Sequence, residues 1–174
     1  MNNVILIGMP GSGKSTIGVL LAKIMGYEFI DSDLLIQKRA GKRLFEIIDE
    51  YGIEYFLNLE SDVNSSIDTE RTVIATGGSA IYSDEAMNHL KKIGKIVYID
   101  VPLDEIKKRI GDFSTRGIIM KNGNSLNELY AERSVLYKKY ADITVRCVGL
   151  TPEECVEKIV NSLKWKEGLT FLIG

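Results

Sequence analysis

A glycine-rich stretch near the N-terminus has the residue types and spacing needed to bind phosphate. It matches the pattern G-x-x-x-x-G-K-[ST], and the residues expected to bind are Gly8, Gly11, Ser12, Gly13, Lys14, Ser15 and Thr16. The glycines let successive backbone N–H groups point inward around a phosphate. The lysine ammonium can reach the β- and γ-phosphates, and the first hydroxyl can bind Mg²⁺. This stretch predicts the binding of a polyphosphate.

Two carboxylates follow the next apolar run, residues 27–30. Asp31 and Asp33 are two positions apart, so on an extended segment they would face the same side. One could hold a water of the Mg²⁺ shell, and the other could accept the proton of an attacking hydroxyl. A strand-end turn in which Asp33 caps the following helix would explain the same pattern. The neighbouring phosphate loop favours the catalytic interpretation.

Two further segments contain residues that could contact ligands. Gly77 and Gly78 follow a third apolar run and would let a ligand approach the backbone, although a simple turn would use them equally. Arg116 lies in residues 111–124, a polar, glycine-rich segment without clear periodicity. Such a segment could be a lid that brings positive charge to a transferring phosphoryl group, or it could leave a solvated surface arginine.

Two more arginines lie on expected helices. Arg133 shares a helical stripe with Leu126, Leu129, Tyr130, Tyr137 and Tyr140. A guanidinium on this inward stripe needs an anionic partner, either an internal carboxylate or a bound anionic substrate, and we favour the substrate. Arg109 ends a basic helix, where it could equally complement the helix dipole or contact a ligand.

The elements that must position these residues alternate between strands and helices. Strands are expected at about 3–7, 27–30, 72–75, 95–101 and 143–145. Helices are expected at about 14–25, 34–41, 45–51, 53–67, 83–92, 102–109, 125–140 and from 151 onward, with Gly52 as a break. This alternation predicts a parallel sheet with helices on both faces. The loops after the first three strands would then meet at one edge of the sheet.

Composition limits the classes of protein that are possible. With 174 residues, 45% of them hydrophobic and 26% charged, the chain is expected to form one soluble globular domain. A net charge of −2 implies no broad field for nucleic acid, and no apolar run approaches the length of a membrane helix. No signal peptide is expected. Cys147 and Cys155 lack metal-ligand spacing and suggest reduced thiols in the cytoplasm, and His89 is expected on the surface.

In order along nearly the whole chain, these residues resemble the shikimate kinase family, a branch of the nucleoside-monophosphate-kinase-like P-loop proteins. The resemblance includes the phosphate loop, Phe29-Ile30-Asp31-Ser32-Asp33, Phe45, Phe56 with Glu60, Thr76-Gly77-Gly78, Arg109, Arg116, and Glu132-Arg133 before Leu136-Tyr137. The phosphate loop alone is specific only to a superfamily. The later motifs together are much more specific.

The resemblance implies an α/β, three-layer P-loop NTPase fold with a five-stranded parallel sheet in the order 2-3-1-4-5. It implies a single domain over 1–174, with a substrate-binding helical segment at about 34–66 and a lid at about 111–124. It also implies ATP, Mg²⁺ and a small hydroxylated substrate in aromatic amino acid biosynthesis, in a cytoplasmic protein expected to be a monomer.

The same resemblance implies a role for each site residue. Asp33 would bind substrate hydroxyls and act as the base, and Asp31 would touch the water shell of Mg²⁺ beside Ser15. Gly77 and Gly78 would contact the substrate, and Arg133 would bind its carboxylate. Arg109 would pack on adenine, and Arg116 would stabilise the transferred phosphate.

Three positions depart from the family pattern. The family usually has an arginine after the phenylalanine of its F-R-x-x-E segment, where this chain has Leu57. The third glycine of the family's G-G-G run is Ser79, and the proline after the lid arginine is Gly117. Losing one of two carboxylate-binding arginines removes a contact worth roughly 1.5–3 kcal/mol. All three departures lie outside the phosphate loop, so phosphoryl transfer is still expected. The difference concerns the acceptor, and Ser79 could bind a different group on a related substrate.

Two other functions remain as alternatives. The chain could be a kinase of the same fold for a polyol or a nucleotide, or a nucleotide-binding module without turnover. A GTPase is not expected, because the N-K-x-D pattern is absent and Asp49-Glu50-Tyr51-Gly52 lies on a helical pattern. A module without turnover should have lost Lys14, Asp33 or the lid arginine, and all three remain.

Overall fold

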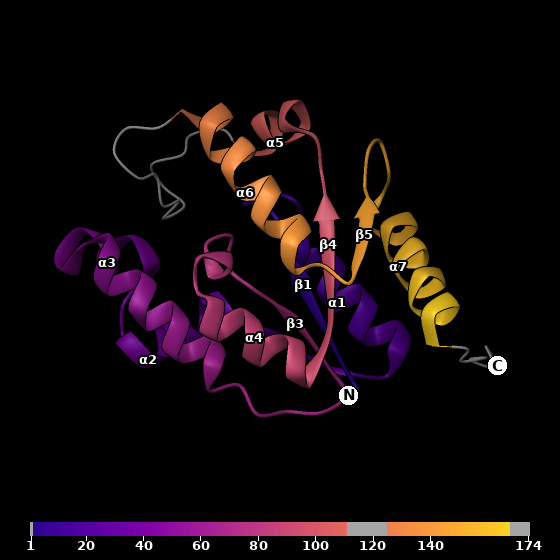
Figure 1. Cartoon of the computed structure of the whole chain (residues 1–174), viewed down its shortest axis with the longest axis horizontal. Helices are drawn as coiled ribbons and strands as arrows, with labels where there is room; N and C mark the ends of the chain where they lie inside the picture. The colour runs from indigo at the N-terminus through magenta and orange to yellow at the C-terminus, as the bar shows by residue number, and fades with distance from the viewer. Residues whose placement is uncertain (1, 111–124, 168–174) are drawn as a thin grey trace.

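A five-stranded parallel sheet forms the centre of the molecule, which we describe from a computed structural model (Figure 1). The structure describes residues 2–110 and 125–167, so the expected lid with Arg116 lies outside the described residues. The strand order is β2-β3-β1-β4-β5, as expected. The strands are β1 (Asn3–Ile7), β2 (Glu28–Asp31), β3 (Thr72–Ala75), β4 (Gly94–Asp100) and β5 (Ile143–Arg146).

The central strand explains why the phosphate loop lies in the middle of the site. β1 is buried along its whole length and pairs with β3 on one side and β4 on the other. Its unbroken apolar run is what a parallel strand covered on both faces requires. The chain leaves β1 directly into the phosphate loop, so this loop lies at the carboxyl edge between the β2–β3 and β4–β5 halves of the sheet.

Helices cover both faces of the sheet. They are α1 (Lys14–Met25), α2 (Ser32–Ala40), α3 (Leu44–Ser65), the short 3₁₀ turn η1 (Ala80–Tyr82), α4 (Asp84–Ile93), α5 (Leu103–Ile110), α6 (Leu126–Tyr140) and α7 (Pro152–Glu167). α1 packs against α7, whereas α4 packs against β4 and α3, and α6 packs against β4 and η1 (Figure 1). Capping follows the sequence: Gly26 ends α1 with a φ of 65°, and Ser83 accepts a hydrogen bond from the Ala86 N–H at the start of α4.

The helices α2 and α3 form a second apolar cluster beside the main core. Its buried members are Ile36, Ile47, Phe56 and Val63. Gly52 interrupts α3 with a φ of 85° and a ψ of 168°, which confirms the expected break between two helical segments. A glycine is needed there because side chains rarely adopt this conformation. The half of α3 after Gly52 carries Phe56 and Glu60 toward the carboxyl edge of the sheet.

The two cysteines and the single histidine lie in the core and in a half-buried position, respectively. Cys147 and Cys155 are both buried and free, and burial raises the pKa of Cys147 to about 12, which keeps its thiol protonated. His89 is only half-buried, and its Nε2 hydrogen-bonds to the carbonyl oxygen of Ile67 at 2.7 Å. Every helix within the described ranges is too short or too polar to cross a membrane.

Candidate active site

A cavity of about 390 Å³ opens at the carboxyl edge of the sheet, above the phosphate loop. Its walls come from the loop, the start of α2, α3, the exit of β3 and α6. The lining residues are Pro10, Gly11, Gly13, Lys14, Ser15, Thr16, Asp33, Leu44, Phe56, Glu60, Thr76, Gly77, Gly78, Ser79 and Arg133. Residues expected to bind nucleotide and residues expected to bind substrate therefore share one cavity. Gly8, Ser12, Asp31 and Arg109 do not line it.

The phosphate loop holds its lysine against its own backbone. Lys14 Nζ donates hydrogen bonds to the carbonyl oxygens of Gly8 at 2.8 Å and Met9 at 3.0 Å. Burial lowers the pKa of Lys14 to about 8, and the negative charge of Asp33 opposes this shift. Gly11 and Gly13 adopt φ values of 77° and 93°, which curl the loop so that it can cradle an anion.

Two other loop residues, Gly8 and Ser12, are buried behind the cavity wall. A Cβ atom at Gly8 would lie 2.8 Å from the carbonyl oxygen of Ile99, so the loop could not approach β4 with any larger residue. Ser12 is buried, and its hydroxyl has no hydrogen-bond partner within the part of the chain that the structure describes.

Asp31 links the end of β2 to the phosphate loop. Its Oδ2 accepts a hydrogen bond from Ser15 Oγ at 2.7 Å, and its Oδ1 accepts one from the Asp33 backbone N–H at 3.0 Å. Asp31 is therefore the N-cap of α2, which corrects both the interpretation of Asp33 as the cap and the extended geometry assumed for this pair. The helix starts at Ser32 because the Asp31 carboxylate satisfies one of its free N-terminal donors, the Asp33 N–H.

Asp33 projects from the first turn of α2 into the cavity. Burial raises the pKa of Asp33 to about 6, the nearby charge of Asp31 adds to this effect, and Lys14 opposes it. The Ser32 hydroxyl accepts a hydrogen bond from the Gly77 N–H at 3.2 Å, which fixes the start of α2 against the exit of β3. A Cβ atom at Gly77 would lie 2.8 Å from Asp33 Oδ1. A larger residue at this position would displace the carboxyl oxygens of Asp33 and Glu60.

Gly78 provides a second close approach, between the phosphate loop and α6. A Cβ atom there would lie 2.8 Å from Pro10 Cδ and 3.0 Å from Arg133 Nη1. The Tyr137 hydroxyl donates a hydrogen bond to the Gly78 carbonyl oxygen at 2.7 Å, which holds this backbone in place. Both expected glycines thus have a steric reason to be glycine.

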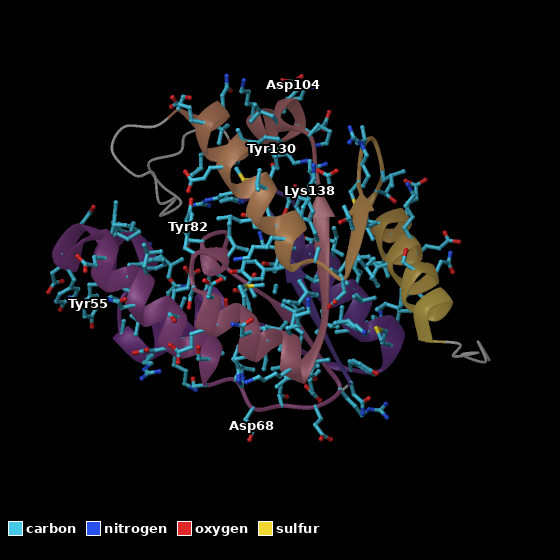
Figure 2. All side chains as sticks on the ribbon, viewed as in Figure 1. Tyr55, Asp68, Tyr82, Asp104, Tyr130 and Lys138 are labelled. Carbon is cyan, nitrogen blue, oxygen red and sulfur yellow. The ribbon has the colours of Figure 1, made fainter. Side chains whose placement is uncertain are left out.

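Arg133 is buried on α6, with 1% of its surface exposed, and it lines the cavity. Its Nε donates a hydrogen bond to the Tyr82 hydroxyl at 3.2 Å, and its guanidinium carbon lies 5.2 Å from the centre of that ring. Tyr82, labelled in Figure 2, reaches this position from the turn after β3. The inward position expected from the helical stripe is confirmed.

Glu60 is a site residue for which no role was predicted from the sequence. It is 1% exposed, lines the cavity, and accepts a hydrogen bond from Ser79 Oγ at 2.6 Å. Burial raises the pKa of Glu60 to about 7, while the hydrogen bond from Ser79 opposes the shift. The signal was present, because Glu60 shares an apolar helical stripe with Phe56 and Val63, as Arg133 does with its own neighbours.

Leu57 and Arg109 do not line the main cavity. Leu57 lines a neighbouring cavity of about 320 Å³, which shares Glu60 and Ser79 with the first. Arg109 lies in the last turn of α5, where its Nη2 is 3.9 Å from Glu105 Oε2. A Cβ atom at Gly11 would lie 3.8 Å from Arg109 Cβ, so this arginine stands beside the phosphate loop.

This fold, with a phosphate loop after the central strand and a buried acid beside it, defines a P-loop kinase. The family model described as shikimate kinase matches residues 10–164. The shikimate kinases of Persephonella marina and Clostridium botulinum (strain 657 / Type Ba4) are 33% and 40% identical to the chain. These alignments cover 94% and 95% of the chain, and 100% and 99% of the relatives.

Solved structures agree with these relatives. Shikimate kinase from Acinetobacter baumannii, in complex with shikimate, superposes with a TM-score of 0.87 at 28% identity, covering 96% of this chain and 95% of that one. Shikimate kinase from Aquifex aeolicus gives a TM-score of 0.81 at 36% identity, covering 94% and 97%. The chain belongs to the shikimate kinase family. It is therefore an ATP-dependent kinase that phosphorylates a hydroxyl group of a small molecule.

Proposed function

We propose that this enzyme transfers the γ-phosphoryl group of ATP to the 3-hydroxyl of shikimate. One observation carries the proposal: a single cavity contains Lys14 for the phosphates, Asp33 for the hydroxyl and Arg133 for an acidic acceptor. A buried guanidinium suits the carboxylate of shikimate, because a charge-assisted pair offsets the cost of burying both groups. The solved relative from Acinetobacter baumannii binds shikimate.

In this proposal Asp33 accepts the proton of the attacking hydroxyl. The backbone at Gly77 and Gly78 contacts the acceptor ring, because both glycines let a ligand approach closely. On the nucleotide side, Arg109 packs on adenine, as the family resemblance implies. Arg116 lies outside the described residues, and by the same resemblance we assign it to the transferring phosphoryl group.

Mg²⁺ fits the oxygen atoms beside the phosphate loop. Ser15 Oγ and Asp31 Oδ2 lie 2.7 Å apart. They would hold the ion directly and through its waters, since Mg²⁺ in kinases keeps several waters and is bound by few protein groups together with phosphates. Bound there, the ion would neutralise charge that develops on the β- and γ-phosphates. Asp31 keeps Ser15 oriented toward that position.

We further infer a cytoplasmic monomer consisting of one kinase domain, in which residues 34–66 help to bind the acceptor. ATP as the phosphoryl donor and two buried, reduced thiols support a cytoplasmic location. A net charge of −2 gives no field for nucleic acid, so a small molecule is the expected partner.

The assignment can be tested by ADP release coupled to a reporter enzyme. Shikimate should give ATP- and Mg²⁺-dependent turnover that exceeds turnover with quinate, other hydroxy acids, sugars and nucleosides. A chelator should abolish it, and excess Mg²⁺ should restore it. No turnover with shikimate, in a protein that still binds ATP, would overturn shikimate as the acceptor and leave a kinase of another hydroxylated metabolite.

That second candidate is favoured by Leu57. Leu57 gives the neighbouring cavity an apolar wall where an arginine could bind a carboxylate. If shikimate is the acceptor, Leu57→Arg should add a second cationic contact and lower the KM for shikimate by about one to two decades, with little change in kcat. Steady-state kinetics with saturating ATP would measure this.

The matched control is Ile24→Arg, which adds the same charge at a residue that is 65% exposed on α1. It should leave the KM for shikimate unchanged. If the true acceptor has an uncharged group beside Leu57, the Leu57→Arg variant would bury an unpaired charge and damage turnover of that acceptor. A higher KM for shikimate in Leu57→Arg, with a normal Ile24→Arg control, would support that alternative.

A further inference from the structure

One buried carboxyl group stands between two cavities at the acceptor end of the sheet. Glu60 is 1% exposed, and it lines both the main cavity of about 390 Å³ and the neighbouring cavity of about 320 Å³. An acid at this depth is costly to ionise unless a donor stabilises its charge. The way in which this carboxyl group is held therefore bears directly on the shape and charge of the acceptor site.

The two oxygen atoms of Glu60 have different surroundings. Oε2 accepts the Ser79 hydroxyl at 2.6 Å, the short distance typical of a charged acceptor. Oε1 has no hydrogen-bond partner in residues 2–110 and 125–167, and it presses against Gly77, where a Cβ atom would overlap it. One oxygen is thus fixed by Ser79, and the other is buried against Gly77, near Asp33, in the wall of the main cavity.

Ser79 uses its hydroxyl in an unusual way for its position. It is the N-cap of η1, where a serine side chain commonly accepts a hydrogen bond from its own turn, yet its side chain makes no capping bond there. The hydroxyl instead reaches across to α3 and Glu60. Ser79 is only 7% exposed, so this hydrogen bond is shielded from water.

A polar or cationic side chain at position 57 could donate a hydrogen bond to Glu60, but this chain has a leucine there. Leu57 precedes Glu60 by three positions on α3, a spacing that puts two side chains on the same side of a helix. It lines the same neighbouring cavity as Glu60 and Ser79. Its side chain is apolar, so the donor to the Glu60 carboxyl comes from the turn after β3 and not from α3.

We propose that Ser79 is a positioning residue, whose hydroxyl holds the Glu60 carboxyl so that Oε1 keeps one orientation over Gly77, in the wall of the acceptor cavity. The role in catalysis rests on the proposed function, whereas the hydrogen bond does not. The charged groups around Glu60 are Asp33 on α2, Lys14 at the start of α1 and Arg133 on α6. Asp33 disfavours ionisation of Glu60, and the two cations favour it.

The test removes the hydroxyl alone. In Ser79→Ala, the Glu60 carboxylate loses its donor, so its pKa should rise by about one unit or more when followed by ¹³C NMR of the glutamate side chains. The KM for shikimate should rise by about tenfold or more, with a smaller change in kcat, because the wall of the acceptor cavity is no longer fixed. Ser79→Thr retains a hydroxyl and should keep both values near those of the wild type.

Two more variants make the result specific. Ser162→Ala is the matched control, because Ser162 lies on α7, outside both cavities, and its Oγ donates a hydrogen bond to the Lys158 carbonyl oxygen at 2.8 Å. It should change neither value. The double variant Leu57→Arg/Ser79→Ala should lower the Glu60 pKa again, since a guanidinium at position 57 can replace the lost donor.

The outcomes separate this proposal from the assignment of the acceptor. An unchanged Glu60 pKa in folded Ser79→Ala would overturn the positioning role, whatever happens to the KM. The NMR titration needs no turnover, so it still decides the hydrogen bond if shikimate proves not to be the acceptor. A raised pKa with an unchanged KM for a confirmed acceptor would also overturn the role, because the contact would then be structural only.

Discussion

Lys14→Ala should abolish phosphoryl transfer, with kcat falling by more than about a thousandfold. The lysine ammonium lies inside the phosphate loop, on the carbonyl oxygens of Gly8 and Met9, where it is positioned to move onto the β- and γ-phosphates. No other side chain that lines the described cavity combines a positive charge with a place in this loop. Turnover measured by ADP release at saturating ATP and shikimate tests the loss.

A matched control keeps this result from being attributed to general loss of charge. Lys23 lies in the last turn of the same helix, exposed and away from the cavity, so Lys23→Ala should keep near-normal turnover. Circular dichroism should confirm that both variants fold. Turnover of Lys14→Ala within about tenfold of the wild type would remove the central claim about the phosphate loop.

Asp33→Asn should lower kcat by about 10²–10⁴ while ATP binding is largely kept. The amide has nearly the shape of the carboxylate but cannot accept the proton of the attacking hydroxyl. Burial raises the pKa of Asp33 to about 6, and the group is a base only when ionised. Wild-type kcat/KM for the acceptor should therefore fall as the pH drops through about 6, and this limb should disappear in the variant.

Asp68→Asn is the control for this substitution, because Asp68 is exposed in the loop between α3 and β3 (Figure 2). It should leave kcat and ATP affinity unchanged. Calorimetric titration with an unreactive ATP analogue would measure nucleotide binding separately. If Asp33→Asn weakened nucleotide binding but left kcat at saturation intact, Asp33 would be a structural or metal-shell residue.

The features that the sequence predicted best depend on local periodicity and spacing. The buried run of β1, the glycine pattern of the phosphate loop and the break at Gly52 are each contained within a few residues. Arg133 was placed correctly because a helical stripe spans only a few turns. The sheet order followed from the family resemblance, since alternation alone fixes parallel strands but not their neighbours.

The features that the sequence did not predict depend on contacts between distant elements. Ser79 and Glu60 are 19 positions apart on different elements, and nothing in the neighbouring sequence indicates that the Ser79 hydroxyl donates to the Glu60 carboxyl group. The sequence offered Asp33 as a possible helix cap, and only the hydrogen bond from the Asp33 N–H to Asp31 shows that Asp31 is the cap instead. The apolar stripe that contains Glu60 can be recognised in the sequence, but its hydrogen-bond partner Ser79 cannot.

The strand order has a consequence for how enzymes of this architecture diverge. Leu57, Glu60 and Ser79 belong to segments that adjoin β2 and β3, on one side of β1, whereas Arg109 follows β4 on the other side. Substitutions at well-separated sites have nearly independent effects. Substitutions that change acceptor preference can therefore accumulate beside β2 and β3 without disturbing the residues on the ATP side of the site. Arg133 is the exception, because it follows β4 in the chain but lines the main cavity. A substitution of Arg133 would therefore have to be compatible with both the acceptor side and the ATP side of the site.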